Sequence, residues 1–227
     1  MKGKLYVIAT PIGNLEDITF RAIGILKKVI FILAEDTRES KKLLNRYKIT
    51  TQLISYRDQN HERMLPKILE KLDMGLDLAL ISDCGTPLIS DPGYQLVSEL
   101  RELEYEVIPI PGPSALTSAL SVSGMPIDKF TFLGFLPKSE AKRKNLLKKY
   151  GELGSTLVIY ESPHRLLKLL KQIYEVLGER KVFLAKDISK RRETFISEEI
   201  FSLIKKLEKK EEIHGEYVVL IRGDIKD

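Results

Sequence analysis

Short apolar runs alternate along the first half of the chain with segments in which apolar residues recur every three or four positions. A continuous apolar run is typical of a strand buried on both faces, and the longer spacing is typical of an amphipathic helix. The predicted strands are residues 4–9, 29–34, 52–56, 77–82 and 105–110, and the predicted helices are residues 19–28, 38–47, 61–74 and 91–103. This alternation predicts a parallel sheet with helices on both faces and right-handed crossovers.

The sequence PIPGPSALTSAL at 109–120 interrupts the alternation with three prolines and then a small-residue helix, for which Ser114 is a natural N-cap. We therefore predict two α/β domains, residues 1–111 and 112–227. In the second domain a helix at 198–210 joins two of the predicted strands, while other strands pair as neighbours, so its sheet should be mixed. The predicted strands there are residues 130–133, 155–160, 181–185, 193–197 and 216–222.

Composition narrows the class of protein. With 43% hydrophobic residues the chain can bury a sizeable core, yet it has no apolar run near the roughly 20 residues of a membrane span and no signal-peptide pattern. A single cysteine, Cys84, excludes an intrachain disulfide and fits a reducing compartment. We expect a cytoplasmic protein without a membrane partner.

The segments that follow the predicted strands are the candidate ligand-binding loops, because ligands of open α/β sheets bind beyond the carboxyl ends of the strands. They are rich in Gly, Pro, Ser, Thr and Asp, which allow close and rigid approach of the backbone to a ligand. These loops are residues 9–19, 34–40, 82–93 and 111–115.

One of these loops, within LISDCGTPLISDPG at 80–93, carries Leu-Ile-Ser-Asp-x-Gly twice. We interpret the first copy as the turn leaving a strand, with Asp83 at the site. The second copy starts the next helix, with Asp91 as N-cap and Pro92 at the first helical position. The alternative for Asp83 is turn chemistry alone.

Several common sites are missing from the sequence. It has no G-x-G-x-x-G after the first strand, no P-loop, no H-E-x-x-H and no G-x-S-x-G. Three scattered histidines and one cysteine make a zinc site improbable, so we predict no metal.

The net charge of +5 permits a nucleic-acid partner but does not require one, since a lysine-rich solvated surface gives the same value. The positive charge is concentrated in KSEAKRKNLLKK at 138–149 and KDISKRR at 186–192, whereas KKLEKKEE at 205–212 mixes both signs and reads as a solvated helix face.

Six blocks, ATPIGNLEDIT, AEDTRESKKLL, LISDCGTPLISDPG, PIPGPSALTSAL, FLGFLPKS and ESPHRL, resemble the tetrapyrrole methylase superfamily in order and spacing. Within it they resemble the branch that methylates the 2′-hydroxyl of a cytidine in 16S ribosomal RNA, since TPIGNLEDIT replaces the glycine-rich first loop of the tetrapyrrole and diphthine enzymes. The resemblance spans about residues 4–222. It implies S-adenosylmethionine in a cleft between two α/β domains, and a homodimer.

The resemblance also implies residue roles. Those matching cofactor positions are Pro11, Asp83, Cys84, Gly85, Thr86, Ile89, Ser114, Ala115, Tyr160, Glu161, Asp187 and Gly215. Pro11 and Gly13 match a loop near the acceptor. The branch often has Ala in place of Cys84, which favours a small packing or backbone-contact role for Cys84 over a nucleophile. It also often has a further C-terminal segment, so we expect this chain to hold its substrate without one.

A ribose hydroxyl is a weak acid, so its methylation favours a general base. We predict Asp83, Glu161 and Lys186 as catalytic candidates, with Glu35, Asp36 and His164 as further possibilities that capping or a helix start would also explain.

For RNA we predict phosphate contacts from Arg38, Arg165 and the 138–149 run, and a stacking face from Phe132 and Phe135. Arg165 could instead pair with a carboxylate, the aromatic rings could be core, and the run could be a solvated helix. The predicted RNA-binding residues are Gly13, Arg38, Lys138, Lys142, Arg143, Lys144 and Arg165.

The favoured function is thus methylation of 16S rRNA, free or in the small ribosomal subunit, with S-adenosylmethionine as cofactor. The alternatives are a methylase of the same fold acting on a small molecule such as a tetrapyrrole, and a non-catalytic RNA-binding module.

Overall fold

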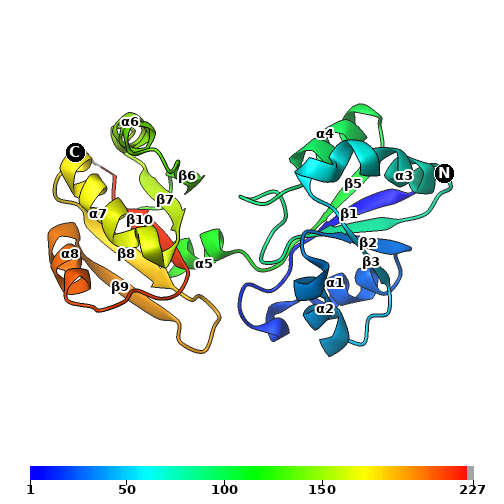
Figure 1. Ribbon diagram of the computed structural model, residues 1–227, viewed down its shortest axis with the longest axis horizontal. Helices are drawn as coiled ribbons and strands as arrows, with labels where there is room; N and C mark the ends of the chain where they lie inside the picture. The colour runs from blue at the N-terminus through cyan, green and yellow to red at the C-terminus, as the bar shows by residue number, and fades with distance from the viewer. Residues whose placement is uncertain (224–227) are drawn as a thin grey trace. The chain divides into compact units, whose positions relative to one another are not determined.

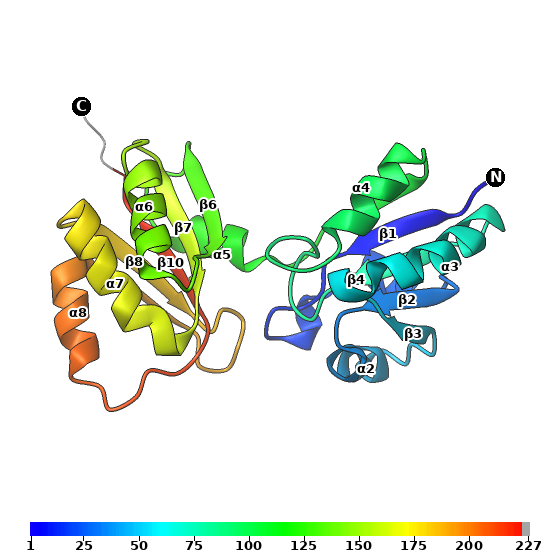
Figure 2. The ribbon, with the colours of Figure 1, turned by 45° about the horizontal axis from the view of Figure 1, so that its top comes forward.

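The computed structural model describes residues 1–223, and it divides the chain into two compact units, the first Met1–Ser114 and the second beginning at Ala115. The division falls a few residues after the predicted boundary at 111. Each unit contains its own five-stranded sheet. Figure 1 and Figure 2 show the ribbon of both units.

The first unit has a parallel sheet in the order β3-β2-β4-β1-β5. Its strands are β1 (Lys4–Ile8), β2 (Phe31–Ala34), β3 (Gln52–Ser55), β4 (Leu78–Ile81) and β5 (Glu106–Ile110). Its helices are α1 (Phe20–Leu26), α2 (Thr37–Arg46), α3 (His61–Asp73) and α4 (Tyr94–Glu102), with short 3-10 turns η1 (Leu15–Asp17) and η2 (Asp58–Asn60). Every strand predicted in this half is present, and the predicted parallel sheet is confirmed.

Two buried clusters hold this unit together, one on each face of the sheet. One joins the sheet to α3 and α4 and includes Leu33, Leu80 and Leu96. The other joins it to α1 and α2 and includes Ile32 and Leu26. Because Ile32 and Leu33 are neighbours in β2 and point to opposite faces, the apolar run of this strand serves both clusters.

Side-chain caps mark the starts of two helices in this unit, α1 and α2. Thr19 precedes α1, and its side chain accepts a hydrogen bond from the N–H of Ala22 at 3.1 Å. Asp36 accepts one from the N–H of Arg38 at 2.9 Å, so the capping interpretation of Asp36 is confirmed.

The second unit has a mixed sheet in the order β6-β7-β10-β8-β9. Its elements are α5 (Ala115–Val122), β6 (Phe130–Phe135), α6 (Glu140–Gly151), β7 (Thr156–Glu161), α7 (Pro163–Leu177), β8 (Lys181–Lys186), β9 (Thr194–Glu199), α8 (Ile200–Glu208) and β10 (Tyr217–Ile221). Among the described strands of this sheet, β6 and β7 pair in parallel, whereas the β7–β10, β10–β8 and β8–β9 pairs are antiparallel. The predicted mixed sheet is confirmed.

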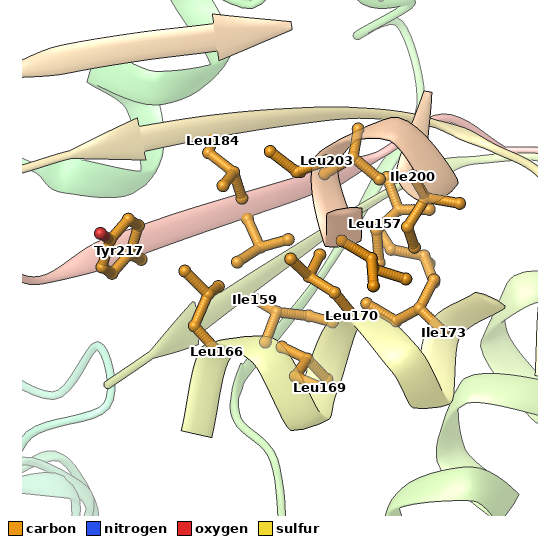
Figure 3. Close-up of a cluster of buried hydrophobic side chains, with 14 of the residues drawn as sticks. Leu157, Ile159, Leu166, Leu169, Leu170, Ile173, Leu184, Ile200, Leu203 and Tyr217 are labelled. Atoms are coloured by element: carbon orange, nitrogen blue, oxygen red, sulfur yellow. The ribbon is translucent and has the colours of Figure 1, made fainter. Parts of the chain in front are cut away.

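The two faces of the second sheet are covered unequally. The larger cluster, shown in Figure 3, joins α6, α7 and α8 to side chains such as Leu157, Ile159 and Leu184. The other face carries a smaller cluster that includes Val158, Phe183 and residues of the short helix α5. This second face therefore leaves more of its aromatic side chains accessible. None of the helices within residues 1–223 has the length and apolar character of a membrane span.

Candidate functional site

The loops after β1 and β4 meet at the carboxyl edge of the first sheet. These two strands are neighbours, and the helices that follow them, α1 and α4, cover opposite faces. Such a reversal of direction marks the switch point of an open α/β sheet, where ligands bind at the strand ends. We refer to this edge, where the loops after β1 and β4 meet, as the crevice. Here Thr10 and Gly85 exchange backbone hydrogen bonds of 2.8 and 3.0 Å, and the buried Thr10 Oγ1 donates to the carbonyl of Ser82 at 3.1 Å. Hydrogen bonds of the backbone therefore join the two loops at the crevice.

The other two predicted loops are tied to the same place. The N–H of Asp36, after β2, donates to Oδ1 of Asp83 at 3.1 Å. Thr86 Oγ1 donates to the carbonyl of Pro113, after β5, at 3.4 Å. Gly85 has φ +77°, and a Cβ there would lie 3.3 Å from Ile12 Cγ2, so glycine suits both the backbone and the close packing. The structure thus brings all four predicted loops together.

The segment after this turn has an unusual backbone. Leu88 and Ser90 have backbone φ angles of 72° and 69°, which residues other than glycine seldom adopt. Leu88 packs its side chain against the α3–α4 cluster, while Ile89 between them stays 40% exposed. A left-handed leucine is retained only where packing fixes it, and such strain is found often at ligand sites.

The predicted cap at Asp91 is wrong. Helix α4 begins at Tyr94, and its N-cap is Gly93 with φ 122°, where a Cβ would lie 2.9 Å from Leu80 Cδ2. Asp91 is partly buried instead, and burial raises its pKa to about 6, with Glu35 and Asp83 adding to the rise. Asp91 and Pro92 have the sequence pattern of a helix start, but the helix starts after Gly93.

Three carboxyl groups, those of Asp83, Asp91 and Glu35, interact with one another at the crevice. Burial, followed by the charge of Asp83, also raises the pKa of Glu35 at the end of β2. Asp36 differs, because its hydrogen bonds with Arg38 hold the pKa of its carboxyl far below the usual range. Arg38 is exposed but pairs with Asp36 at 2.7 Å, so the phosphate role predicted for it would compete with that pair.

The remaining predicted residues of this unit differ in accessibility. Pro11 is buried, whereas Gly13 is exposed in the loop after β1. Cys84 is exposed, and its carbonyl accepts a hydrogen bond from Ser82 Oγ at 3.3 Å, which favours the backbone-contact role over the packing role. Ser114 is partly buried and directly precedes α5.

In the second unit, the predicted residues at the end of β8 and before β10 come together. The N–H of Asp187 donates to the carbonyl of Glu216 at 2.9 Å, and Asp187 Oδ1 accepts from the N–H of Glu216 at 3.1 Å. A Cβ on Gly215, which has φ +101°, would lie 2.5 Å from Lys186 Cε and 2.6 Å from Asp187 Oδ2. Lys186 Nζ lies 3.8 Å from the Asp187 carboxylate. Only glycine fits against this pair.

Tyr160 and Glu161, predicted as joint cofactor contacts, point to opposite faces of β7. Tyr160 joins the less covered face, where Phe132 and Phe135 lie edge-on to it with ring centroids at 4.9 and 5.7 Å. The Glu161 side chain has no exposed surface, and its Oε1 lies 3.3 Å from Arg165 Nε and accepts from the N–H of Ser162 at 2.8 Å. This enclosure argues against direct contact of Glu161 with a substrate.

Two predicted RNA-binding arginines face inward. Arg143 is 2% exposed, and its Nη2 donates to the carbonyl of Lys138 at 3.2 Å. Arg165 donates to the carbonyl of Leu136 at 2.7 Å and pairs with Glu161. Both arginines bind carbonyl groups of the loop between β6 and α6. The prediction of Arg143 as a phosphate contact is wrong, because its side chain is buried. For Arg165, pairing with a carboxylate is favoured over phosphate binding.

The basic run is less available than its composition indicates. Lys144 pairs with Glu140 at 3.0 Å and Glu175 at 2.8 Å, which engages its charge within α6 and α7. Lys138 and Lys142 are exposed. The 3.6-residue period of the helix explains why lysines of α6 differ in availability. Residues on the side of α6 that faces α7 contact that helix, whatever their charge. Phe132 is partly buried, whereas Phe135 is 58% exposed and keeps an accessible ring.

Comparison with known proteins agrees with this architecture. The model of the family "Tetrapyrrole (Corrin/Porphyrin) Methylases" matches residues 4–204. A Thermotoga maritima protein named "Ribosomal RNA small subunit methyltransferase I" is 46% identical, and the match covers 97% of this chain and 99% of that protein. Proteins of the same name from Halalkalibacterium halodurans and Bacillus subtilis are 43% and 41% identical, with 98% and 97% of this chain and 77% and 75% of theirs covered. The chain belongs to the tetrapyrrole methylase family.

Proposed function

We propose that this protein is an S-adenosylmethionine-dependent methyltransferase that modifies the ribose 2′-hydroxyl of a cytidine in 16S ribosomal RNA. The names of relatives at 41–46% identity, matched over nearly the whole chain, support an rRNA substrate. The observation that carries the proposal is the crevice between β1 and β4, in which loops far apart in sequence are held by the Thr10–Gly85 backbone pair.

The residues at this crevice fit a cationic methyl donor. Asp83, Asp91 and Glu35 place three carboxyl groups at the carboxyl edge of the first sheet, and their mutual repulsion adds to burial in raising the pKa values of Asp91 and Glu35. The donor supplies an activated methyl group on a sulfonium, and carboxylates close to it favour such a charge. The exposed backbone of Asp83 and Cys84 would bind its polar groups, with Gly85 allowing close approach.

In the second unit we propose cofactor contacts from Tyr160, Asp187 and Gly215. Gly215 has no side chain between its backbone and the Lys186–Asp187 pair. We propose that the space beside this glycine accommodates the adenine ring of the cofactor. Ala115, at the start of α5, is partly buried on the same side of the sheet as Tyr160.

For the chemistry, we propose Asp83 and Lys186 as the candidates that accept the proton of the 2′-hydroxyl while its oxygen takes the methyl group. Asp83 is exposed at the crevice, and Lys186 is partly buried beside Asp187. Positioning of the two reactants supplies much of the rate enhancement in such a displacement. Glu161 is not included, because its carboxylate is enclosed.

For the acceptor, we propose that phosphates contact the exposed Lys138 and Lys142, with Phe135 as a stacking ring and Gly13 allowing close approach at the first loop. The carboxylates of the crevice repel phosphate groups. We therefore expect a ribose of the RNA, and not a phosphate, to enter the crevice. We also propose a homodimer as the active form.

The test is methyl transfer to purified small ribosomal subunits and to free 16S rRNA from a strain lacking the endogenous modification, with labelled S-adenosylmethionine. We expect one labelled cytidine, with the label on its ribose, because the nucleoside keeps an unmodified base. A label on a base, or on no RNA, would refute the proposal. Cofactor binding in calorimetry without any RNA labelling would favour a small-molecule acceptor, and no cofactor binding would favour a non-catalytic module.

A further inference from the structure

The turn between β8 and β9 is a rigid projection from the second sheet. It comprises residues 187–193 and includes two left-handed backbone positions, Asp187 and Ser189, with φ of 52° and 66°. The N–H of Ser189 donates to Glu193 Oε2 at 2.8 Å, and the N–H of Lys190 donates to the carbonyl of Asp187 at 2.9 Å. Figure 1 and Figure 2 show this turn extending past the ends of its strands. The backbone is therefore fixed before any partner binds.

The three consecutive basic residues of this turn have different environments. Lys190 is engaged within the protein, since its Nζ lies 2.8 Å from Glu216 and 3.8 Å from Asp187. Arg191 and Arg192 are exposed, and no carboxylate among residues 1–223 lies within ion-pair distance of either guanidinium. The internal bonds of Lys190 thus fix the turn and direct two arginine charges to solvent.

An aromatic ring lies a few residues further along β9. Phe195 is 42% exposed and stacks on Phe183 with ring centroids 5.9 Å apart and an angle of 11° between the rings. Phe183 is 4% exposed, so it is a fixed support that holds Phe195 in one orientation. Among the described strands β9 pairs only with β8, which makes it the edge of the sheet.

We propose that Arg191, Arg192 and Phe195 form a second RNA-binding surface, which takes a single-stranded segment of the substrate. The guanidinium groups would bind consecutive phosphates, and one base would stack on the Phe195 ring. Arginine pairs with phosphate in a planar, bidentate manner, and stacking on a fixed aromatic ring suits any base. This inference rests on an RNA substrate, and it is separate from the contacts proposed at Lys138 and Lys142.

The side chains of the surface favour RNA over a second copy of the chain. An exposed edge strand can also pair with a partner strand through its backbone, but such pairing would not use the Phe195 ring or the two arginine side chains of the turn. The β9 edge as a dimer contact is accordingly an outcome that the experiment must distinguish.

The experiment compares Arg191→Glu/Arg192→Glu with Lys209→Glu/Lys210→Glu, which reverses two exposed charges after α8 and changes the net charge equally. Binding of a short unstructured RNA and of small ribosomal subunits is measured as a function of salt. We expect the arginine variant to bind both about tenfold or more weakly, with a salt slope smaller by about 1.4 for the single-stranded RNA. Phe195→Leu should weaken binding of the short RNA about tenfold without changing that slope.

Calorimetry with S-adenosylmethionine and sedimentation give the remaining readouts. Unchanged cofactor affinity and oligomeric state in the arginine variant would support the proposal. Equal effects in the arginine and lysine variants would overturn it, as would a change of oligomeric state with unchanged RNA affinity. Since RNA binding is measured directly, a wild-type protein that binds RNA but does not methylate it contradicts the proposed function alone.

Discussion

The buried carboxyl of Asp91 makes a stability prediction that depends on pH. In the folded protein burial raises its pKa from 3.8 to about 6, so the folded state holds a proton that the unfolded state has already released between these values. Free energy of unfolding should therefore fall as the pH rises from about 4 through 6 and then stay level. A rise of about two pH units corresponds to about 3 kcal/mol, which screening of a partly exposed group reduces to roughly 1–2 kcal/mol.

The substitution Asp91→Asn should remove this contribution, because the amide has nearly the same shape as the carboxyl group but does not titrate and carries no charge. At pH 4 the variant and the wild type should have the same unfolding midpoint. At pH 7.5 the variant should be more stable by roughly 1–2 kcal/mol, or about 2–6 °C in the midpoint for a chain of this size.

Differential scanning calorimetry of the cofactor-free protein between pH 4 and 7.5 measures this difference, with the exposed Asp128→Asn as a matched control that should follow the wild type. A difference between Asp91→Asn and wild type that is equal at both ends of the pH range, or a less stable variant at pH 7.5, would refute the reasoning.

Further substitutions test proposed site residues and the stability of each unit. Asp83→Ala should weaken S-adenosylmethionine binding about tenfold in calorimetry, since a charged partner is lost, and unchanged affinity would exclude that role. Gly215→Ala should weaken cofactor binding and lower the unfolding free energy by about 1–3 kcal/mol, because a Cβ would lie 2.5 Å from a neighbouring side chain. Gly24→Ala, where a Cβ meets nothing within 4 Å, should instead stabilise α1 by about 0.5–1 kcal/mol in thermal unfolding. Glu161→Ala should cost about 3 kcal/mol by leaving Arg165 without its carboxylate, and a variant as stable as wild type would show the pair to be dispensable.

The secondary structure was largely predictable because each strand is a compact apolar run. The strands within the runs at 29–34 and 77–82, Phe31–Ala34 and Leu78–Ile81, are buried on both faces, as a continuous apolar run predicts. The loops with candidate chemistry were found by the same route, since they follow these strands directly.

The orientation of single side chains was less predictable. Whether Arg143 faces solvent or α7 depends on how two helices pack, and a basic run contains no information about that contact. Likewise, Asp91 and Pro92 carry a cap signal, and only the packing of Leu80 and Leu88 against Gly93 shifts the helix start to Tyr94. The pattern of apolar residues therefore predicts the helices and strands, whereas the packing between them determines which charged side chains are accessible to a ligand.

The strand order of the first sheet has a consequence for synthesis of the protein. β1 is made before the other strands of this sheet, but its two neighbours, β4 and β5, are the last of them to be made. At about 5–20 residues per second, the roughly 70 residues between β1 and β4 keep β1 without either partner for about 4–14 s. Its apolar side chains remain open to premature association during that time, so the nascent chain should depend on a holding chaperone until Ile110 has emerged.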